Sequence, residues 1–156
     1  MKIKIRKAKK EDIDAIAELN KKLFDFHRSF DKYYKSGSEY KKTFKKYLSS
    51  VIRKRGIKIL VAEDDNKIIG YFIGTIERAW PFTIPKKIGK ISDGFIEEKY
   101  RGLGIGREMF NELIHWFKKN KVKHVLIYVD ERNKLGMKVW KRFKFKEFLK
   151  LMRLDL

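Results

Sequence analysis

Cysteine is absent from this sequence of 156 residues. The chain can therefore form no disulfide, thiolate metal site, iron–sulfur cluster or cysteine nucleophile. Its three histidines, His27, His115 and His124, do not follow metal-ligand spacing, so we expect no metal site. The core must therefore hold itself together without covalent cross-links, and 43% hydrophobic residues are enough for one globular domain.

Long apolar runs are missing as well. The first fifteen residues alternate charged with single apolar residues, and no run approaches the roughly 18 residues of a membrane-spanning helix. We therefore expect neither a signal peptide nor a membrane helix, and a cytoplasmic protein. Glutamine is absent, proline is scarce and lysine, isoleucine and glutamate are abundant, a composition that favours a thermophilic source.

Charge is present in large excess of one sign. Lys and Arg number 40 against 20 Asp and Glu, a formal net charge of +20. The excess lies in residues 1–58 and 101–156, whereas 59–100 is nearly neutral. Such a distribution attracts a polyanion, which could be a nucleotide, a nucleic acid or an acidic protein.

Apolar periodicity predicts the order strand, two helices, three strands, helix, strand, helix, strand. The predicted helices begin at Asp12, span about 38–55, begin at Ile105 and span about 133–143. The predicted strands cover 3–5, 57–62, 68–76, 88–96, 125–129 and 145–156. Residues 125–129 are uniformly apolar, which predicts a central strand, and 145–156 would close the sheet. Residues 1–156 thus form one mixed α/β domain.

Three glycines in five residues separate the strand at 88–96 from the helix that starts at Ile105. Glycine lets a backbone approach a ligand closely, and the first amides of a helix lack intrahelical acceptors, so this turn can cradle a phosphate. A tight turn that binds nothing is the alternative. The spacing fits neither a P-loop, since Arg107 and Glu108 follow the last glycine, nor a dinucleotide-binding fingerprint.

The turn resembles the signature of the GNAT superfamily of acyl-CoA-dependent N-acetyltransferases. The pattern of Arg or Gln, two residues, Gly, one residue, then Gly or Ala is matched by residues 101–106. The resemblance covers nearly the whole chain. It includes Arg6 and Ala8 with the first helix, residues 68–71 in a strand, and Asn133, Val139-Trp140 and Phe145 near the end.

This resemblance implies a mostly antiparallel mixed sheet of six to seven strands, splayed between the fourth and fifth strands and flanked by about four helices. Acetyl-CoA would lie in the opening, with Gly94 marking a bulge there. Its pantetheine arm would pair with Gly94, Phe95 and Ile96. Its diphosphate would rest on Arg101, Gly102, Leu103, Gly104, Ile105, Gly106 and Arg107. Residues of the last helix would complete the site: Asn133, Lys134, Lys138 and Trp140.

Acyl transfer to an amine requires removal of a proton from the ammonium form. Asp93 is the first candidate for this base and Glu97 the second, whereas both could instead be solvent-facing carboxylates. The N–H of Ile96 would hold the oxyanion. Many family members place a tyrosine at the position of Trp140 to protonate the leaving thiolate, which an indole cannot do. Water, a relayed ammonium proton or Tyr128 would replace it.

The resemblance implies an N-acetyltransferase that moves an acetyl group from acetyl-CoA to a primary amine of an unidentified acceptor. The net charge disfavours free polyamines and favours acidic or RNA-associated acceptors. Two alternatives are a basic nucleic-acid-binding module on the same scaffold and an acyl-CoA sensor without turnover. Trp80 and Phe82, beside the two prolines, could form an acceptor-side lid or a homodimer contact.

Overall fold

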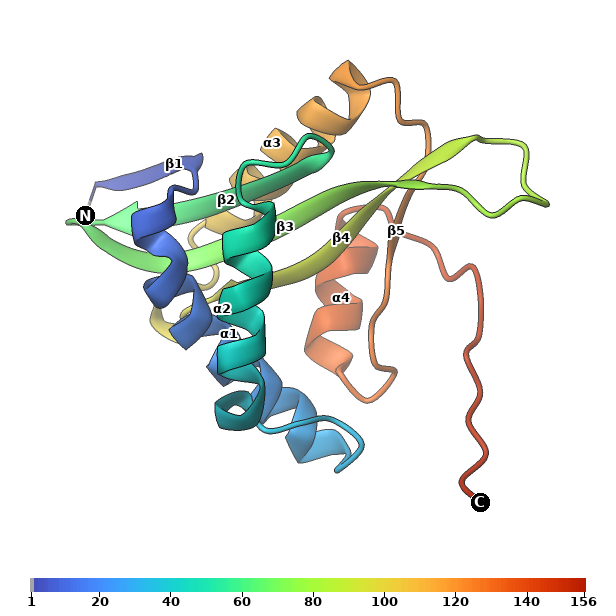
Figure 1. Cartoon of the computed structure of the whole chain (residues 1–156), viewed down its shortest axis with the longest axis horizontal. Coiled ribbons are helices and arrows are strands. Elements are labelled where there is room, and N and C mark those ends of the chain that lie inside the picture. The colour runs from blue at the N-terminus through green and yellow to red at the C-terminus, as the bar shows by residue number, and fades with distance from the viewer. Residues whose placement is uncertain (1) are drawn as a thin grey trace.

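The computed structural model describes residues 2–156 and contains one five-stranded sheet (Figure 1). The strands lie in the order of the chain, and every pair is antiparallel except the last, which is parallel. Their bounds are β1 Ile3–Lys7, β2 Ile57–Asp64, β3 Lys67–Arg78, β4 Lys87–Ile96 and β5 Val125–Ile127.

The helices are α1 Ile13–Phe30, α2 Gly37–Val51, α3 Ile105–Lys119 and α4 Lys134–Arg142, with short 3-10 turns at Lys10–Asp12 and Glu98–Tyr100. Local sequence sets their starts. Ser36 precedes α2, where its hydroxyl accepts from the N–H of Glu39 while the Glu39 carboxylate accepts from the N–H of Ser36. This reciprocal cap satisfies amides that the helix itself cannot.

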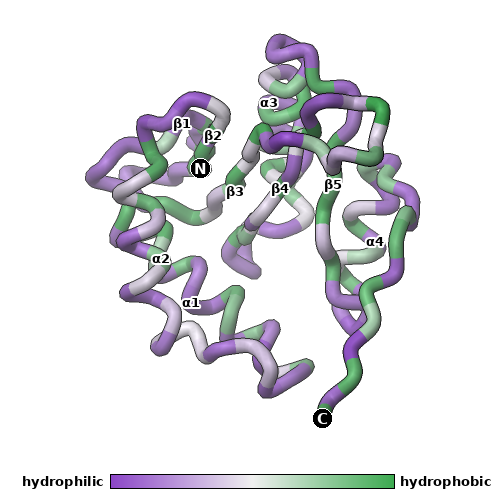
Figure 2. The backbone as a smooth tube through the Cα atoms, turned by 45° about the vertical axis from the view of Figure 1, so that its right-hand side comes forward, coloured by the Kyte–Doolittle hydropathy of each residue, from purple (hydrophilic) through white to green (hydrophobic). Residues whose placement is uncertain are grey.

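Two apolar cores lie on opposite faces of the sheet. Successive residues of β2 alternate between them, because side chains of a strand point to opposite faces. Ile59 and Val61 pack with α1 and α2, whereas Leu60 and Ala62 pack with α3. Figure 2 shows apolar segments along the strands and hydrophilic segments on the outer helices.

Polar groups anchor α1 to the sheet. The Arg6 guanidinium of β1 binds Asp12 at 2.7 Å and Glu63 of β2 at 2.5 Å. The Arg6 hydrogen bond holds the pKa of Asp12 below its usual value. Inside the first core, the Asn20 amide donates to the Tyr71 hydroxyl at 2.9 Å. These contacts fix the start and the middle of α1 against β1 to β3.

Two predictions about strands were wrong. The sheet has five strands rather than six or seven, because residues 145–156 form no strand. β5 was expected in the centre, yet it is a three-residue strand at the end of the sheet. The chain turns from Asp130 to Asn133 into α4 soon after Ile127. Residues 145–156 pair with no strand among the described residues, so they do not extend the sheet beyond β5.

No helix within residues 2–156 has both the length and the apolar composition needed to cross a membrane.

Candidate active site

The site is built around an opening between β4 and β5. These strands pair only from Gly89 to Ile91, with Val125 to Ile127 as partners. β4 then continues to Ile96 with only β3 beside it, while β5 diverges (Figure 1). The edge of β4 from residue 92 to residue 96 thus has no strand partner on the side of β5.

A bulge bends β4 where the opening begins. Ile73 of β3 faces Asp93 and Gly74 faces Ile91, so Ser92 is the extra residue. The bulge was expected at Gly94, two residues later. Gly94 instead lies against Phe72, whose ring carbons would be 2.9 Å from an added Cβ. Its lack of a side chain is required by this packing.

Asp93 lies in β4 immediately beside the bulge. Its charge acts on Tyr40, Tyr47 and Tyr71, which belong to the first core or pack against it. Burial raises the pKa of Asp93 to about 7, and the positive charge of Lys90 opposes this rise only in part. Within residues 2–156 its carboxylate has no hydrogen-bond partner. It is a carboxylate that can exchange a proton near neutral pH.

Glu97, the second carboxylate singled out from the sequence, is already paired. Its Oε1 accepts from the Lys22 Nζ of α1 at 2.6 Å, and 19% of its side chain is exposed. Lys22 was not expected here, because no sequence pattern joins residues 75 positions apart. The pair links α1 to the end of β4.

Tyr128 follows β5 directly and is 67% exposed. The Lys90 Nζ of β4 lies 4.9 Å from the centroid of its ring, a cation–π contact across the last paired residues of the two strands. Lys90 therefore contacts Tyr128 and also influences Asp93. It is a second residue that the sequence did not bring to attention.

The glycine turn leads from β4 into α3. Gly102 and Gly104 have φ angles of +79° and +84°, which favour glycine, and an added Cβ at either would meet nothing within 4 Å. Gly104 precedes α3 and no side chain caps that helix. Among the described residues, the amides from Gly102 to Gly106 find no protein acceptor. The turn thus presents an open row of N–H groups.

Arg101 ties this turn to the strand. Its Nε donates to the carbonyl of Ile96 at 3.0 Å, and its guanidinium carbon lies 5.4 Å from the centroid of the Phe95 ring. The side chain thus lies on the last residues of β4 and holds the turn beside the unpaired edge.

Similarity to known proteins shows the family of the chain. The acetyltransferase (GNAT) family matches residues 9–145. The chain belongs to the GNAT acetyltransferase family.

The sequence of this chain is similar to those of two archaeal proteins. It is 29% identical over 144 residues to an uncharacterized N-acetyltransferase of Methanocaldococcus jannaschii, with 92% of this chain and 60% of that protein covered. The chain thus spans less than two thirds of that relative. An uncharacterized N-acetyltransferase of Archaeoglobus fulgidus is 26% identical over 137 residues, covering 84% of each chain.

The fold is shared with solved structures. A predicted acetyltransferase of Clostridium acetobutylicum, crystallised with acetyl-CoA, superposes with a TM-score of 0.80 at 21% identity. The match covers 99% of this chain and 96% of that one. This likeness shows a GNAT fold in the present chain.

The last GNAT helix, α4, faces the opening from the side of β5. The Asn133 Oδ1 caps it by accepting from the N–H of Gly136 at 2.8 Å, so this oxygen is already engaged. Lys134 and Lys138 are exposed. Trp140 is partly buried in the second core, with its ring centroid 6.1 Å from that of Phe72. Through Phe72 the indole is connected to Gly94.

A polar bridge joins the two sides of the opening. The Tyr34 hydroxyl, between α1 and α2, donates to Asp130, between β5 and α4, at 3.0 Å. Arg132 binds Asp130 at 2.7 Å and Asp31 at 3.3 Å. The Arg132 guanidinium holds the pKa of Asp130 well below its usual range. Burial lowers the pKa of nearby His27.

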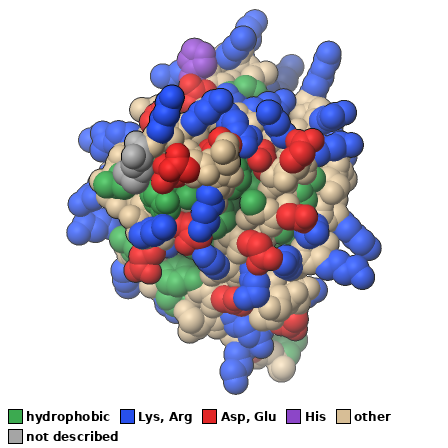
Figure 3. All heavy atoms as spheres, turned by 90° about the vertical axis from the view of Figure 1, so that its left-hand side faces the viewer, with side chains coloured by type: hydrophobic (Ala, Val, Ile, Leu, Met, Phe, Trp, Pro, Cys, Tyr) green, Lys and Arg blue, Asp and Glu red, His purple; other side chains and the backbone are tan. Residues whose placement is uncertain are grey.

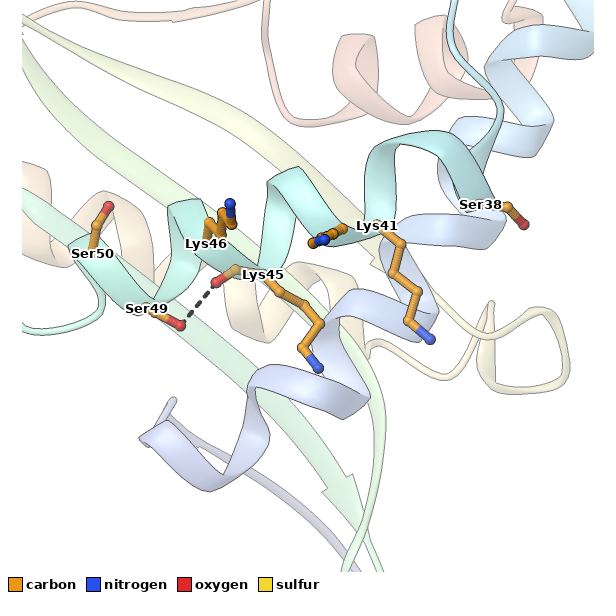
Figure 4. A pocket seen from close by; sticks show the side chains of 7 residues that line it. Ser38, Lys41, Lys45, Lys46, Ser49 and Ser50 are labelled. Carbon is orange, nitrogen blue, oxygen red and sulfur yellow. Dashed lines mark hydrogen bonds between the residues drawn. The ribbon is translucent and has the colours of Figure 1, made fainter.

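A surface hollow lies elsewhere, along α2 (Figure 4). Lys41 pairs with Glu18 and Lys45 with Asp14, both on α1. The face of the molecule in Figure 3 likewise shows Lys and Arg interspersed with Asp and Glu. The hollow is a basic helix face. Its lining residues are Ser38, Lys41, Lys42, Lys45, Lys46, Ser49 and Ser50.

Proposed function

We propose that the protein transfers an acetyl group from acetyl-CoA to a primary amine by direct attack on the thioester. The observation that carries this proposal is the position of Asp93. It is a carboxylate without a partner, with a pKa raised to about 7, on the strand that borders the opening and leads to the glycine turn.

The chain's own residues fit acetyl-CoA. The free amides from Gly102 to Gly106 are suited to a diphosphate. Their N–H groups can donate hydrogen bonds to its oxygens, and the positive end of the α3 dipole attracts its negative charge. Arg107, in the first turn of α3, adds a positive charge. The edge of β4 from Gly94 to Ile96 offers backbone groups to the amides of a pantetheine arm.

Residues at and before α4 and the last residue of β4 complete this binding site. Lys134 and Lys138 are exposed and can reach phosphate groups, and Asn133 retains its amide nitrogen as a donor. Trp140 would contact the thioester end of the arm through apolar surface. The Ile96 N–H would donate to the developing oxyanion.

When bound, acetyl-CoA supplies a thioester, whose carbonyl carbon forms a bond to the acceptor nitrogen while its bond to sulfur breaks. Asp93 accepts the proton that the acceptor ammonium must lose. A base with a pKa of about 7 is suited to this task, because it is substantially ionised at neutral pH yet binds a proton readily. Glu97 is the less favoured base, since Lys22 already neutralises it.

Tyr128 is the proposed source of a proton for the departing thiolate. Trp140 cannot supply one, because an indole N–H is not acidic near neutral pH. The phenol follows β5 at the opening, and Lys90 lies over its ring. Water can serve as a second source, because a thiol with a pKa of roughly 8.5 is a tolerable leaving group.

We infer an acidic or RNA-associated acceptor from the charge of +20, which would repel a free polyamine. The same charge motivates the competing function, a nucleic-acid-binding module on a GNAT scaffold. On the face in Figure 3, acidic side chains interrupt the basic ones, so this face presents no continuous basic surface to a nucleic acid.

Calorimetric titration with acetyl-CoA at low salt is the first test. Heat of binding is expected, and its absence together with an RNA affinity that falls steeply with salt would establish the competing function. Release of thiol during a screen of amines, peptides and ribosomal proteins then separates turnover from an acyl-CoA sensor.

The second test uses Asp93→Asn and Tyr128→Phe, with Asp65→Asn in the exposed β2–β3 turn as the matched control. Loss of the base should lower kcat/KM about 10²- to 10⁴-fold and remove an acidic limb near pH 7. Asp65→Asn should retain wild-type turnover. Unchanged turnover in both site variants would refute the assigned roles.

A further inference from the structure

The connection between β3 and β4, which we call the hairpin loop (residues 79–86), projects from the packed body of the molecule. Figure 1 shows it at the far right of the view, away from the helices. Its large apolar side chains belong to neither core. Phe82 is 84% exposed and Ile84 is fully exposed.

The hairpin loop is also a long uncharged run in a highly charged chain. Residues 79–85 carry no charge, although 38% of the whole chain is Asp, Glu, Lys or Arg. The other uncharged run of at least this length, residues 68–76, lies within β3 and is largely buried. An exposed apolar run of this kind indicates a surface that contacts something other than water.

Much of the backbone of the hairpin loop is already satisfied. Its two prolines have no N–H group. The N–H of Ala79 donates to the carbonyl of Lys86, and the N–H of Thr83 donates to the carbonyl of Trp80, both at 3.0 Å. The rings of Trp80 and Phe82 are stacked, with their centroids 5.7 Å apart. Unpaired N–H groups resist transfer out of water, so this loop can leave water at a lower cost than an open turn.

Two other connections lie beside the base of the hairpin loop. The N–H of Ile76 in β3 donates to the carbonyl of Gly56 at 2.7 Å, which joins the α2–β2 connection to the hairpin. The N–H of Gly89 in β4 donates to the carbonyl of His124 at 2.9 Å, which joins the α3–β5 connection to it. Three segments far apart in the sequence therefore meet at this end of the sheet.

These segments surround the apolar loop with positive charge. Residues 54–56, 78–87 and 118–124 contain nine basic residues and no acidic one. All nine are exposed, and none of them pairs with a carboxylate among residues 2–156. The adjacent Glu77 accepts from the Thr75 hydroxyl at 2.7 Å. We call the nine residues the basic collar: Lys54, Arg55, Arg78, Lys86, Lys87, Lys118, Lys119, Lys121 and Lys123.

We propose that the hairpin loop and the basic collar form a docking surface for an anionic membrane. The loop inserts its apolar side chains between the headgroups, where tryptophan is favoured, and the collar contacts the lipid phosphates. A nucleic acid would match the collar but offers no apolar phase to Phe82 and Ile84. A second copy of this chain would bring two collars of the same sign together, which is unfavourable.

Docking in this way leaves the opening between β4 and β5 in water. β4 begins at Lys87 beside the hairpin loop, and Asp93 lies roughly 20 Å further along the strand, at about 3.3 Å per residue. The glycine turn follows the far end of β4. Membrane binding needs no acetyl-CoA, so its failure would leave the proposed transfer reaction untouched.

Co-sedimentation of the full chain with lipid vesicles tests the docking surface. The wild type should sediment with phosphatidylglycerol vesicles and not with phosphatidylcholine vesicles, because the collar requires anionic headgroups. Ile84→Ser should weaken binding about tenfold or more, the effect of leaving such a side chain unburied. Leu151→Ser is the matched control, because Leu151 is 96% exposed and outside both cores, and should bind like the wild type. No sedimentation of the wild type, or equal weakening by the two variants, would overturn the proposal.

Two double variants test the position of the collar. Lys86→Glu with Lys119→Glu changes the collar, whereas Lys42→Glu with Lys46→Glu makes the same change of net charge on α2. All four residues are exposed. The collar variant should bind phosphatidylglycerol vesicles about 25-fold or more weakly, since each basic residue near such a surface contributes about fivefold. The α2 variant should retain most of the binding. Equal losses would show attraction by the whole chain and reject the collar.

Tryptophan fluorescence distinguishes insertion from attachment to the surface. Emission of the wild type should move to shorter wavelength with phosphatidylglycerol vesicles, because the Trp80 indole leaves water. Trp80→Phe should remove the shift, since Trp116 and Trp140 pack against the second core. Sedimentation without a shift in the wild type would refute insertion. Binding to single-stranded RNA that Ile84→Ser weakens, without binding to vesicles, would show a nucleic-acid surface instead and would also refute the proposal.

Discussion

The unpaired carboxylate of Asp93 should cost the protein stability above neutral pH. Burial raises its pKa from 3.8 to about 7, so the folded chain holds this proton more tightly than the unfolded chain does. The contribution to stability is fully present below pH 4 and is lost as the pH rises to about 7. A difference of 7 − 3.8 = 3.2 pH units corresponds to at most about 4 kcal/mol.

Asp93→Asn removes the titration while keeping the shape of the side chain. Relative to the wild type, the variant should gain about 3 kcal/mol of unfolding free energy between about pH 5 and about pH 8, because only the part of the shift between pH 5 and the folded pKa of about 7 falls in this range. Urea unfolding followed by circular dichroism measures this difference. Other groups titrate equally in both proteins, so their effects cancel.

Asp65→Asn serves again as the matched control, because it removes the same charge from an exposed turn. The unfolding free energy of Asp65→Asn should change with pH as that of the wild type does, between about pH 5 and about pH 8. If the unfolding free energy of Asp93→Asn changed with pH in parallel with that of the wild type, Asp93 would be ionised over the whole pH range measured. Its proposed role as a base with a pKa near 7 would then fail.

Two further predictions concern the framework of the site. Arg6→Met leaves the largely buried Asp12 and Glu63 without their cation and should lower the unfolding free energy by about 3 kcal/mol, measured by urea unfolding at neutral pH. An unchanged midpoint would show that the two carboxylates are adequately solvated. Gly89→Ala places a Cβ 2.7 Å from the buried Phe117 ring and should cost about 1–3 kcal/mol. Adding Phe117→Leu should recover part of that loss, and strictly additive costs would contradict a clash between these two residues.

Local signals in the sequence predicted most of the elements. The helix at 133–143 is observed as α4 at Lys134–Arg142, and the strand at 88–96 as β4 at Lys87–Ile96. These predictions rest on periodicity and caps, which act over a few residues. The glycine turn was located for the same reason, since positive φ angles at Gly102 and Gly104 depend on local backbone geometry.

The sequence did not predict features that depend on residues far apart in the chain. The apolar run at 125–129 resembles a central strand, yet β5 is at the end of the sheet because residues 145–156 do not pair with it. The bulge at Ser92 depends on the register of β3, which Gly94 does not reveal. Lys22 and Lys90 approach the site only after folding, so no spacing in the chain could have identified them.

The bridge formed by Tyr34, Asp130 and Arg132 connects parts of the molecule that belong to different cores. α1 and α2 pack on one face of the sheet, while Trp140 of α4 packs in the core on the other. Apart from the shared strands, the connection between the α1–α2 side and the α4 side consists of a hydrogen bond and ion pairs rather than apolar contacts. Dissolved salt screens the attraction between charged groups and so weakens such a connection, but it does not weaken apolar packing. Rising ionic strength is therefore expected to weaken this connection between the two sides of the opening before it affects the apolar cores.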